Sequence, residues 1–226
     1  MTLIVILPGS DGTGDLLREF VAALGKLRTL VIAYPADQVL SYEQLAEFIR
    51  PKLPTTEPYY LLGESFGGPL AILLAAAQCG SCAGVILCAS FVRYPATLRR
   101  ALAPLFPPMP VSLIPLGIMS WFLLGRWSTP VLRAQLARAL ASVSPAAMRA
   151  RVRAALYINV AAQTNAIRVP LLYLQATHDR IVPNSAGRAI AGALPQTRLV
   201  QVVGPHFLLQ AAPQACAAEV RRFVGC

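Results

Sequence analysis

Gly63-Glu64-Ser65-Phe66-Gly67 decides the fold, because it places one serine where a buried strand turns sharply into a helix. The run Tyr59–Leu62 before it is aromatic and apolar, and Gly67-Gly68-Pro69 opens an Ala/Leu-rich segment that reaches about Gln78. Glycine two residues to either side of the serine lets the backbone reverse without a Cβ clash. This context predicts that Ser65 is a nucleophile held at the carboxyl end of a sheet. The alternative is a loop of small residues at a strand end.

A nucleophilic serine needs a base and a group that orients the base. Only two histidines are present, His178 and His206. His206 follows the strand-like run Arg198–Val203, and Asp179 follows the apolar run Leu171–Leu174. Because ligands bind at the carboxyl edge of an open parallel sheet, we expect His206 to be the base and Asp179 the acid.

The choice of acid is narrow. Only Asp179 and Glu219 follow Ser65 in the chain. Glu219 falls in a predicted terminal helix, away from the strand ends. The sequence therefore favours Asp179 as the acid.

A glycine-rich loop, Leu7-Pro8-Gly9-Ser10-Asp11-Gly12-Thr13-Gly14, follows the strand-like run Leu3–Leu7 and precedes a helical pattern. Its three glycines let backbone amides turn inward toward a developing negative oxygen. We expect the amides of Ser10 and Phe66 to form an oxyanion hole, with Asp11 as the alternative to Ser10. Glycine-rich turns before helices also bind phosphates. The spacing, however, matches neither G-x-G-x-x-G nor the lysine-containing P-loop.

These motifs resemble those of the α/β-hydrolase superfamily over essentially the whole chain, with the weakest fit between residues 91 and 168. The loop Leu7–Gly14, the elbow Gly63–Gly67 and the segment Gly204-Pro205-His206 are similar to those of short bacterial serine hydrolases. A similar loop occurs in the hydrolase-like part of plant plastid acyltransferases that esterify phytol and diacylglycerol. Many relatives carry His-Gly where this chain has Pro8-Gly9.

The resemblance implies a catalytic triad in the chain order of this superfamily. Its nucleophile, acid and base are Ser65, Asp179 and His206. The leading hypothesis is a serine hydrolase that cleaves small-molecule esters of apolar acyl groups through an acyl-enzyme. A thioesterase or an acyltransferase would use the same residues. The alternative from another class is a non-catalytic hydrolase-like protein that binds a ligand, although such proteins usually lack a member of the triad.

Strand-like and helical runs alternate regularly along the chain. The strand-like runs are 3–7, 29–34, 59–62, 84–88, 171–174 and 198–203. Helical patterns fall near 15–25, 42–53, 67–78, 184–193 and 213–223, and the N-cap signal Ser144-Pro145 starts another through about Ala161. This order predicts an α/β fold with a doubly wound, mainly parallel six-stranded sheet. Larger members of the superfamily begin with two further antiparallel strands, so the resemblance implies a trimmed version.

One long segment interrupts this rhythm, because a crossover needs only about a dozen residues. We therefore predict a single domain of 226 residues, with its core at 1–90 and 169–226 and a helical cap insertion at about 91–168. Within that insertion, Ala101–Gly125 carries no charge and five prolines. The prolines favour an apolar lid or a membrane-dipping loop over a continuous spanning helix.

Charge is concentrated in the same insertion. Residues 1–90 carry five basic and eight acidic groups, a net of −3, and residues 169–226 carry a net of +3. Residues 91–168 carry ten arginines and no acid. A basic surface is predicted from Arg133, Arg138, Arg149, Arg151 and Arg153. It fits peripheral contact with an anionic membrane surface or an acidic acyl substrate, although arginine for solubility alone is the alternative. No nucleic-acid-binding module is recognised, so no nucleic acid partner is expected.

The remaining features concern location and cofactors. Met1–Leu7 lacks the basic start of a secretory signal and runs directly into the glycine-rich loop, so a cytoplasmic location is expected. The pair Cys79 and Cys82 has no second ligand pair or nearby histidine, so we predict neither a metal nor a redox site there. The proposed chemistry requires no metal and no organic cofactor.

Overall fold

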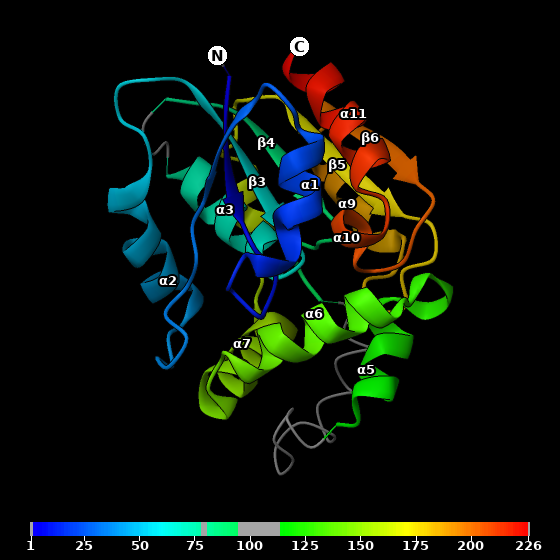
Figure 1. Cartoon of the computed structure of the whole chain (residues 1–226). Helices are drawn as coiled ribbons and strands as arrows, with labels where there is room; N and C mark the ends of the chain where they lie inside the picture. The colour runs from blue at the N-terminus through cyan, green and yellow to red at the C-terminus, as the bar shows by residue number, and fades with distance from the viewer. Residues whose placement is uncertain (1, 78–80, 95–113, 226) are drawn as a thin grey trace.

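The computed structural model describes residues 2–77, 81–94 and 114–225 (Figure 1). Its centre is a parallel sheet with the strand order β2-β1-β3-β4-β5-β6. The strands are β1 Leu3–Leu7, β2 Arg28–Val31, β3 Tyr59–Glu64, β4 Cys82–Cys88, β5 Leu171–Ala176 and β6 Thr197–Val202. Each of the six expected strands is present, so the predicted α/β fold is confirmed.

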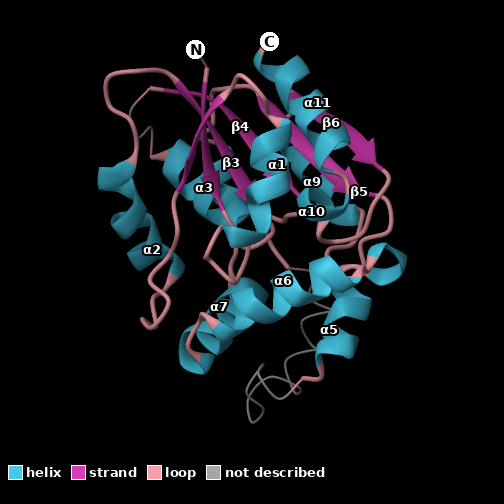
Figure 2. Ribbon diagram, in the orientation of Figure 1, coloured by secondary structure: helices cyan, strands magenta, loops and turns pink. Residues whose placement is uncertain are grey.

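Helices cover both faces of the sheet (Figure 2). The α-helices of the core are α1 Arg18–Ala23, α2 Tyr42–Ile49, α3 Gly67–Ala76, α9 Ser185–Ala193, α10 Leu208–Ala211 and α11 Pro213–Val224. Two single 3-10 turns, η1 Asp15–Leu17 and η2 Arg50–Lys52, adjoin α1 and α2. This layering matches the alternation of elements along the sequence.

Alternate residues of the buried strands enter two separate hydrophobic cores. In β1, Leu3, Val5 and Leu7 pack in the core that also contains residues of α2, α3 and α9. Ile4 and Ile6 pack on the opposite face with residues of α1 and α11. Burial on both faces explains why the strand is apolar without a break, rather than alternating.

The strand order changes direction between β1 and β3. In an open α/β sheet, ligands bind at the carboxyl ends of the strands at such a position. β1 pairs with β2 on one side and with β3 on the other. The loop after β1 and the turn after β3 therefore emerge side by side at the carboxyl edge. These are the glycine-rich loop Leu7–Gly14 and the turn at Ser65.

Residues 114–157 form a helical insertion beyond the carboxyl ends of the strands (Figure 1). It contains α5 Leu116–Leu123, η5 Gly125–Trp127, α6 Pro130–Ala141 and α7 Pro145–Tyr157. The short helix α8 Ala161–Thr164 follows it and packs against α3. Hydrogen bonds join the insertion to loops of the core. Arg180 Nη1 donates to the Trp121 carbonyl at 2.6 Å, and the Phe207 amide donates to the Leu123 carbonyl at 3.0 Å.

Two helices of this insertion, α5 and α6, are absent from the elements expected from the sequence. The start of α6 nevertheless carries the same signal as that of α7. Thr129 Oγ1 accepts from the Leu132 amide at 3.1 Å, and Ser144 Oγ accepts from the Ala147 amide at 3.1 Å. Proline follows each cap, so both helices begin with an N-cap side chain and proline at the first helical position.

Helix α7 ends at Tyr157, short of the expected end near residue 161. The following residues leave the helix to pair with the segment after β4. Arg93 and Asn159 form an antiparallel bridge, and the Val160 amide donates to the Val92 carbonyl at 2.8 Å. Pairing between distant segments thus overrides the local helical pattern.

The apolar run Ala101–Gly125 lies only partly within the described residues, and the four prolines between 104 and 110 fall outside them. Its described part forms α5, which is eight residues long. Across 2–77, 81–94 and 114–225, no helix has the length and apolar character needed to cross a bilayer.

Candidate active site

Ser65 sits in a sharp turn between β3 and α3. Its φ of 48° is in the left-handed region, which costs a non-glycine residue of the order of 1 kcal/mol or more. The Ser65 amide donates to the Cys88 carbonyl at 2.9 Å, and the Gly68 amide donates to the Ser65 carbonyl at 3.0 Å. A Cβ on Gly67 would overlap the backbone of Leu7. The turn therefore needs glycine where the predicted elbow has it.

The structure brings Ser65, His206 and Asp179 into one hydrogen-bonded series. Ser65 Oγ lies 2.9 Å from His206 Nε2. His206 Nδ1 lies 3.0 and 2.9 Å from the two carboxylate oxygens of Asp179. The three side chains follow β3, β6 and β5, so residues far apart in sequence meet at the carboxyl edge of the sheet. This order of nucleophile, base and orienting acid suits acyl transfer.

His206 and Asp179 are withdrawn from water, with side-chain exposures of 3% and 2%. Asp179 Oδ1 also accepts from the amides of Ile181 and Val182, both at 2.8 Å, which holds the carboxylate in place. Burial by itself lowers the pKa of His206. The charge of Asp179 and its hydrogen bond outweigh that effect, with a smaller contribution from Glu64, so the pKa is raised above 6.5.

The other histidine and the other candidate acid lie elsewhere. His178 is exposed, with Nδ1 2.8 Å from Thr177 Oγ1 and its ring 5.1 Å from that of Trp127. Glu219 belongs to α11 and forms ion pairs with two arginines, one of them Arg198 at 3.1 Å. Neither residue enters the hydrogen-bonded series at Ser65.

The glycine-rich loop Leu7–Gly14 turns beside the elbow. The Gly12 amide donates to the Gly9 carbonyl at 3.0 Å, which closes a tight turn. The Asp11 carboxylate accepts from the amide and hydroxyl of Thr13 at 3.0 and 2.6 Å, so this acid is occupied within the loop. Among the hydrogen bonds of the described residues, none uses the amide of Ser10, Asp11 or Phe66. These three amides stay the candidate donors of an oxyanion hole.

Glu64, which precedes the serine, is a buried carboxyl that the sequence reasoning did not single out. It is 4% exposed and accepts from Gln210 Nε2 at 2.9 Å and from the Gly9 amide. Burial raises its pKa to about 7, against the opposing effect of the hydrogen bond from Gln210. The sequence feature that could have singled out Glu64 is a charged residue at the end of an apolar strand.

Arg151 does not belong to the predicted basic surface. It is 2% exposed, and its guanidinium donates to backbone carbonyls of the glycine-rich loop. The prediction was wrong for this residue because it faces the core from α7, whereas Arg133, Arg138 and Arg153 are exposed. Contact of the exposed arginines with an anionic membrane surface stays a prediction.

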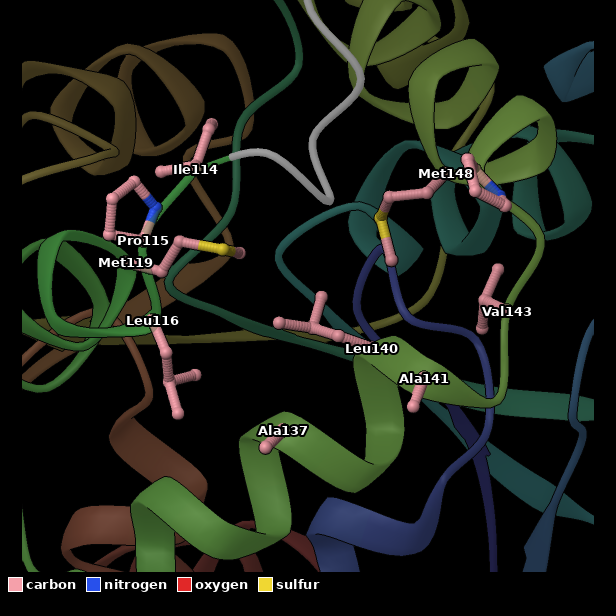
Figure 3. A pocket seen from close by; sticks show the side chains of 10 residues that line it. Ile114, Pro115, Leu116, Met119, Ala137, Leu140, Ala141, Val143 and Met148 are labelled. Carbon is pink, nitrogen blue, oxygen red and sulfur yellow. The ribbon is translucent and has the colours of Figure 1, made fainter.

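The described residues contain no group of three or more His, Cys, Asp or Glu side chains placed to hold a metal ion. They do contain an apolar cavity of about 470 Å³ within the helical insertion (Figure 3). Leu116 and Met119 of α5, Leu140 of α6 and Met148 of α7 are among its lining residues. The cavity can therefore take hydrocarbon rather than a charged group.

Several solved hydrolases have the same fold. An esterase from Exiguobacterium antarcticum has a TM-score of 0.84 at 15% identity, over 100% of this chain and 92% of the esterase. The hydrolase olei00960 from Oleispira antarctica has a TM-score of 0.83 at 12% identity, over 99% and 90%. An enol-lactonase from Burkholderia xenovorans LB400 has a TM-score of 0.76 at 18% identity, over 100% and 92%. At these identities the likeness is one of fold alone.

A family model places the chain more specifically. The model described as serine aminopeptidase, S33, matches residues 31–208, and the chain belongs to that family of α/β hydrolases. The match begins after the glycine-rich loop Leu7–Gly14, so it does not extend to that motif. No curated protein sequence matches the chain.

Proposed function

We propose that the protein is a serine hydrolase that cleaves carboxylic esters of apolar acyl groups. The observation that carries this proposal is the hydrogen-bonded series from Ser65 Oγ through the His206 ring to the Asp179 carboxylate. A serine hydroxyl is a weak nucleophile until a base within hydrogen-bond reach takes its proton. His206 Nε2 meets that requirement at 2.9 Å.

In the proposed reaction, Ser65 Oγ attacks the ester carbonyl carbon while its proton passes to His206 Nε2. Asp179 keeps the Nδ1 proton of the ring directed toward itself and stabilises the imidazolium that forms. The oxyanion accepts hydrogen bonds from the Phe66 amide and from a loop amide, that of Ser10 or Asp11. His206 then gives its proton to the leaving alcohol oxygen, and the C–O bond breaks.

Hydrolysis of the acyl-enzyme repeats these steps with water. His206 takes a proton from water as its oxygen attacks the acyl carbon, and returns that proton to Ser65 Oγ as the acid leaves. A different acceptor at this step would make the protein an acyltransferase, and a thiol leaving group would make it a thioesterase. The site residues are the same in all three reactions.

The apolar cavity of the helical insertion supports an apolar acyl group. Met148 lines it, and Arg151 of the same helix contacts the loop beside Ser65, so α7 borders both. The alternative suggested by the family model's name is cleavage of peptides with a free amino terminus. A cationic amino group needs nearby carboxylates, whereas residues 91–168 supply ten arginines and no acid. This favours an ester over such a peptide.

A substrate series tests the proposal. Purified protein would be assayed with p-nitrophenyl esters of increasing chain length, with acyl thioesters and with aminoacyl p-nitroanilides, alongside the Ser65→Ala variant. Turnover of esters that rises with chain length and vanishes in the variant is expected. Preference for thioesters would move the assignment to a thioesterase. Absence of turnover together with no labelling of Ser65 by a fluorophosphonate would favour a ligand-binding protein.

A further inference from the structure

Arg151 is a buried cation that joins helix α7 to the glycine-rich loop Leu7–Gly14. Its Nη1 donates to the Ser10 carbonyl at 3.0 Å and to the Asp11 carbonyl at 2.8 Å, and its Nη2 donates to the Pro35 carbonyl at 2.7 Å. Within the described part of the chain it forms no ion pair with a carboxylate. Burial of a cation is unfavourable unless its donors are satisfied. The three backbone carbonyls accept hydrogen bonds from the guanidinium and so satisfy these donors.

The direction of the Ser10 carbonyl determines the direction of one candidate oxyanion donor, the Asp11 amide. In a trans peptide unit the C=O and the next N–H point to opposite sides. With its carbonyl turned toward Arg151, Ser10 leaves the Asp11 N–H pointing away from the arginine. The Gly9 carbonyl, which accepts from the Gly12 amide, directs the Ser10 N–H away from the inside of that turn in the same manner.

The rest of the loop is held by groups of the core. The Tyr34 hydroxyl donates to the Pro8 carbonyl at 2.9 Å, and the Tyr34 amide donates to the Gly12 carbonyl at 2.8 Å. The Glu64 carboxyl accepts from the Gly9 amide. Among the described residues, the two carbonyls between these points, those of Ser10 and Asp11, are the ones that take their partner from the helical insertion.

We propose that Arg151 is a positioning residue that orients the Asp11 amide, one of the candidate donors, toward the oxyanion. This inference rests on the proposed function, because ester hydrolysis is what gives this amide an oxyanion to bind. Arg151 does not touch the reacting atoms. It makes alignment of this donor depend on the docking of α7, so the helical insertion acts on the chemistry as well as on substrate binding.

Kinetics of arginine variants test this role. Arg151→Ala is expected to lower kcat for a short soluble ester by about a hundredfold, the size of effect seen when one oxyanion donor is lost, with little change in KM. Free methylguanidinium is expected to restore part of that kcat. Arg151→Lys is expected to restore little, because an ammonium lacks the planar fork that reaches several carbonyls. Arg153→Ala, on the exposed side of the same helix, is the control.

A second readout separates this inference from the proposed function. Hydrogen exchange in peptides that cover residues 8–14 is expected to accelerate in Arg151→Ala and not in Arg153→Ala. If the wild-type protein hydrolyses no ester, the proposed function fails, yet the exchange still shows whether Arg151 holds the loop. If Arg151→Ala fails to fold, kcat and hydrogen exchange of Arg151→Lys test the inference instead. Wild-type kcat or unchanged exchange in a folded Arg151 variant would overturn the inference.

Discussion

Glu64→Gln removes the charge from a carboxyl that is buried beside the serine turn. Burial raises the pKa of Glu64 from 4.5 to about 7, so the folded protein holds this proton more tightly than the unfolded chain does. A raised folded-state pKa gives stability that is complete below about pH 4.5 and is lost as pH rises through about 7. Above that range, the wild-type protein carries an ionised carboxyl 4% exposed to water.

The magnitude follows from the size of this shift. The rise of the Glu64 pKa from 4.5 to about 7, at about 1.4 kcal/mol for each unit of pKa, corresponds to about 3.5 kcal/mol of unfolding free energy. Glutamine has the same shape and does not ionise, and its carbonyl oxygen can still accept from the Gly9 amide. The unfolding free energy of Glu64→Gln relative to that of the wild type is therefore expected to rise by up to about 3.5 kcal/mol from pH 4.5 to above pH 8.

Urea unfolding of both proteins at several pH values measures this difference. The comparison between proteins cancels the titration of groups that they share and that Glu64 does not influence. An unchanged difference across the whole range would refute the reasoning, because it would show that the Glu64 carboxyl ionises as easily in the folded protein as in the unfolded chain.

Two further predictions concern the base and the acid. Asp179→Asn is expected to lower kcat by about ten-thousandfold, because asparagine favours the wrong imidazole tautomer. Glu219→Gln is expected to leave kcat unchanged. The reverse ranking would show that Glu219, and not Asp179, is the acid. On the acid side of the pH profile, kcat/KM is expected to reach half its maximum above about pH 6.5. Burial alone lowers the pKa of His206, but the charge and hydrogen bond of Asp179 raise it by more. Glu64→Gln is expected to move that midpoint down, and a profile flat from acid to alkaline pH would argue against histidine as the base when chemistry limits the rate.

Much of the fold was predictable because its central strands are largely buried on both faces. Runs such as Leu3–Leu7 and Leu171–Leu174 have no polar residue to suggest any other structure, and both appear as strands. Their carboxyl ends position the loops that carry Ser10 and Asp179, so the placement of both loops at one edge of the sheet followed from the parallel order. The sequence could also have predicted α6, because Thr129 followed by proline is an N-cap signal.

The placement of Arg151 could not be predicted from the sequence. Arg149, Arg151 and Arg153 are spaced by two residues, and on a helix such neighbours point about 200° apart. Only the docking of α7 decides which of them meets the core. Glu64 presents a similar case, because a carboxyl next to a nucleophile gives no sign of how deeply the turn and the loop above it will bury it.

Covalent labelling of Ser65 during turnover tests the central claim most directly. Wild-type protein would be quenched while it hydrolyses a p-nitrophenyl ester, digested and examined by mass spectrometry, with Ser65→Ala treated in parallel. We expect an acyl group on the peptide that contains Ser65, and a folded Ser65→Ala protein whose kcat is lower by about a millionfold. An acyl group on another residue, or undiminished hydrolysis by the folded variant, would contradict the account.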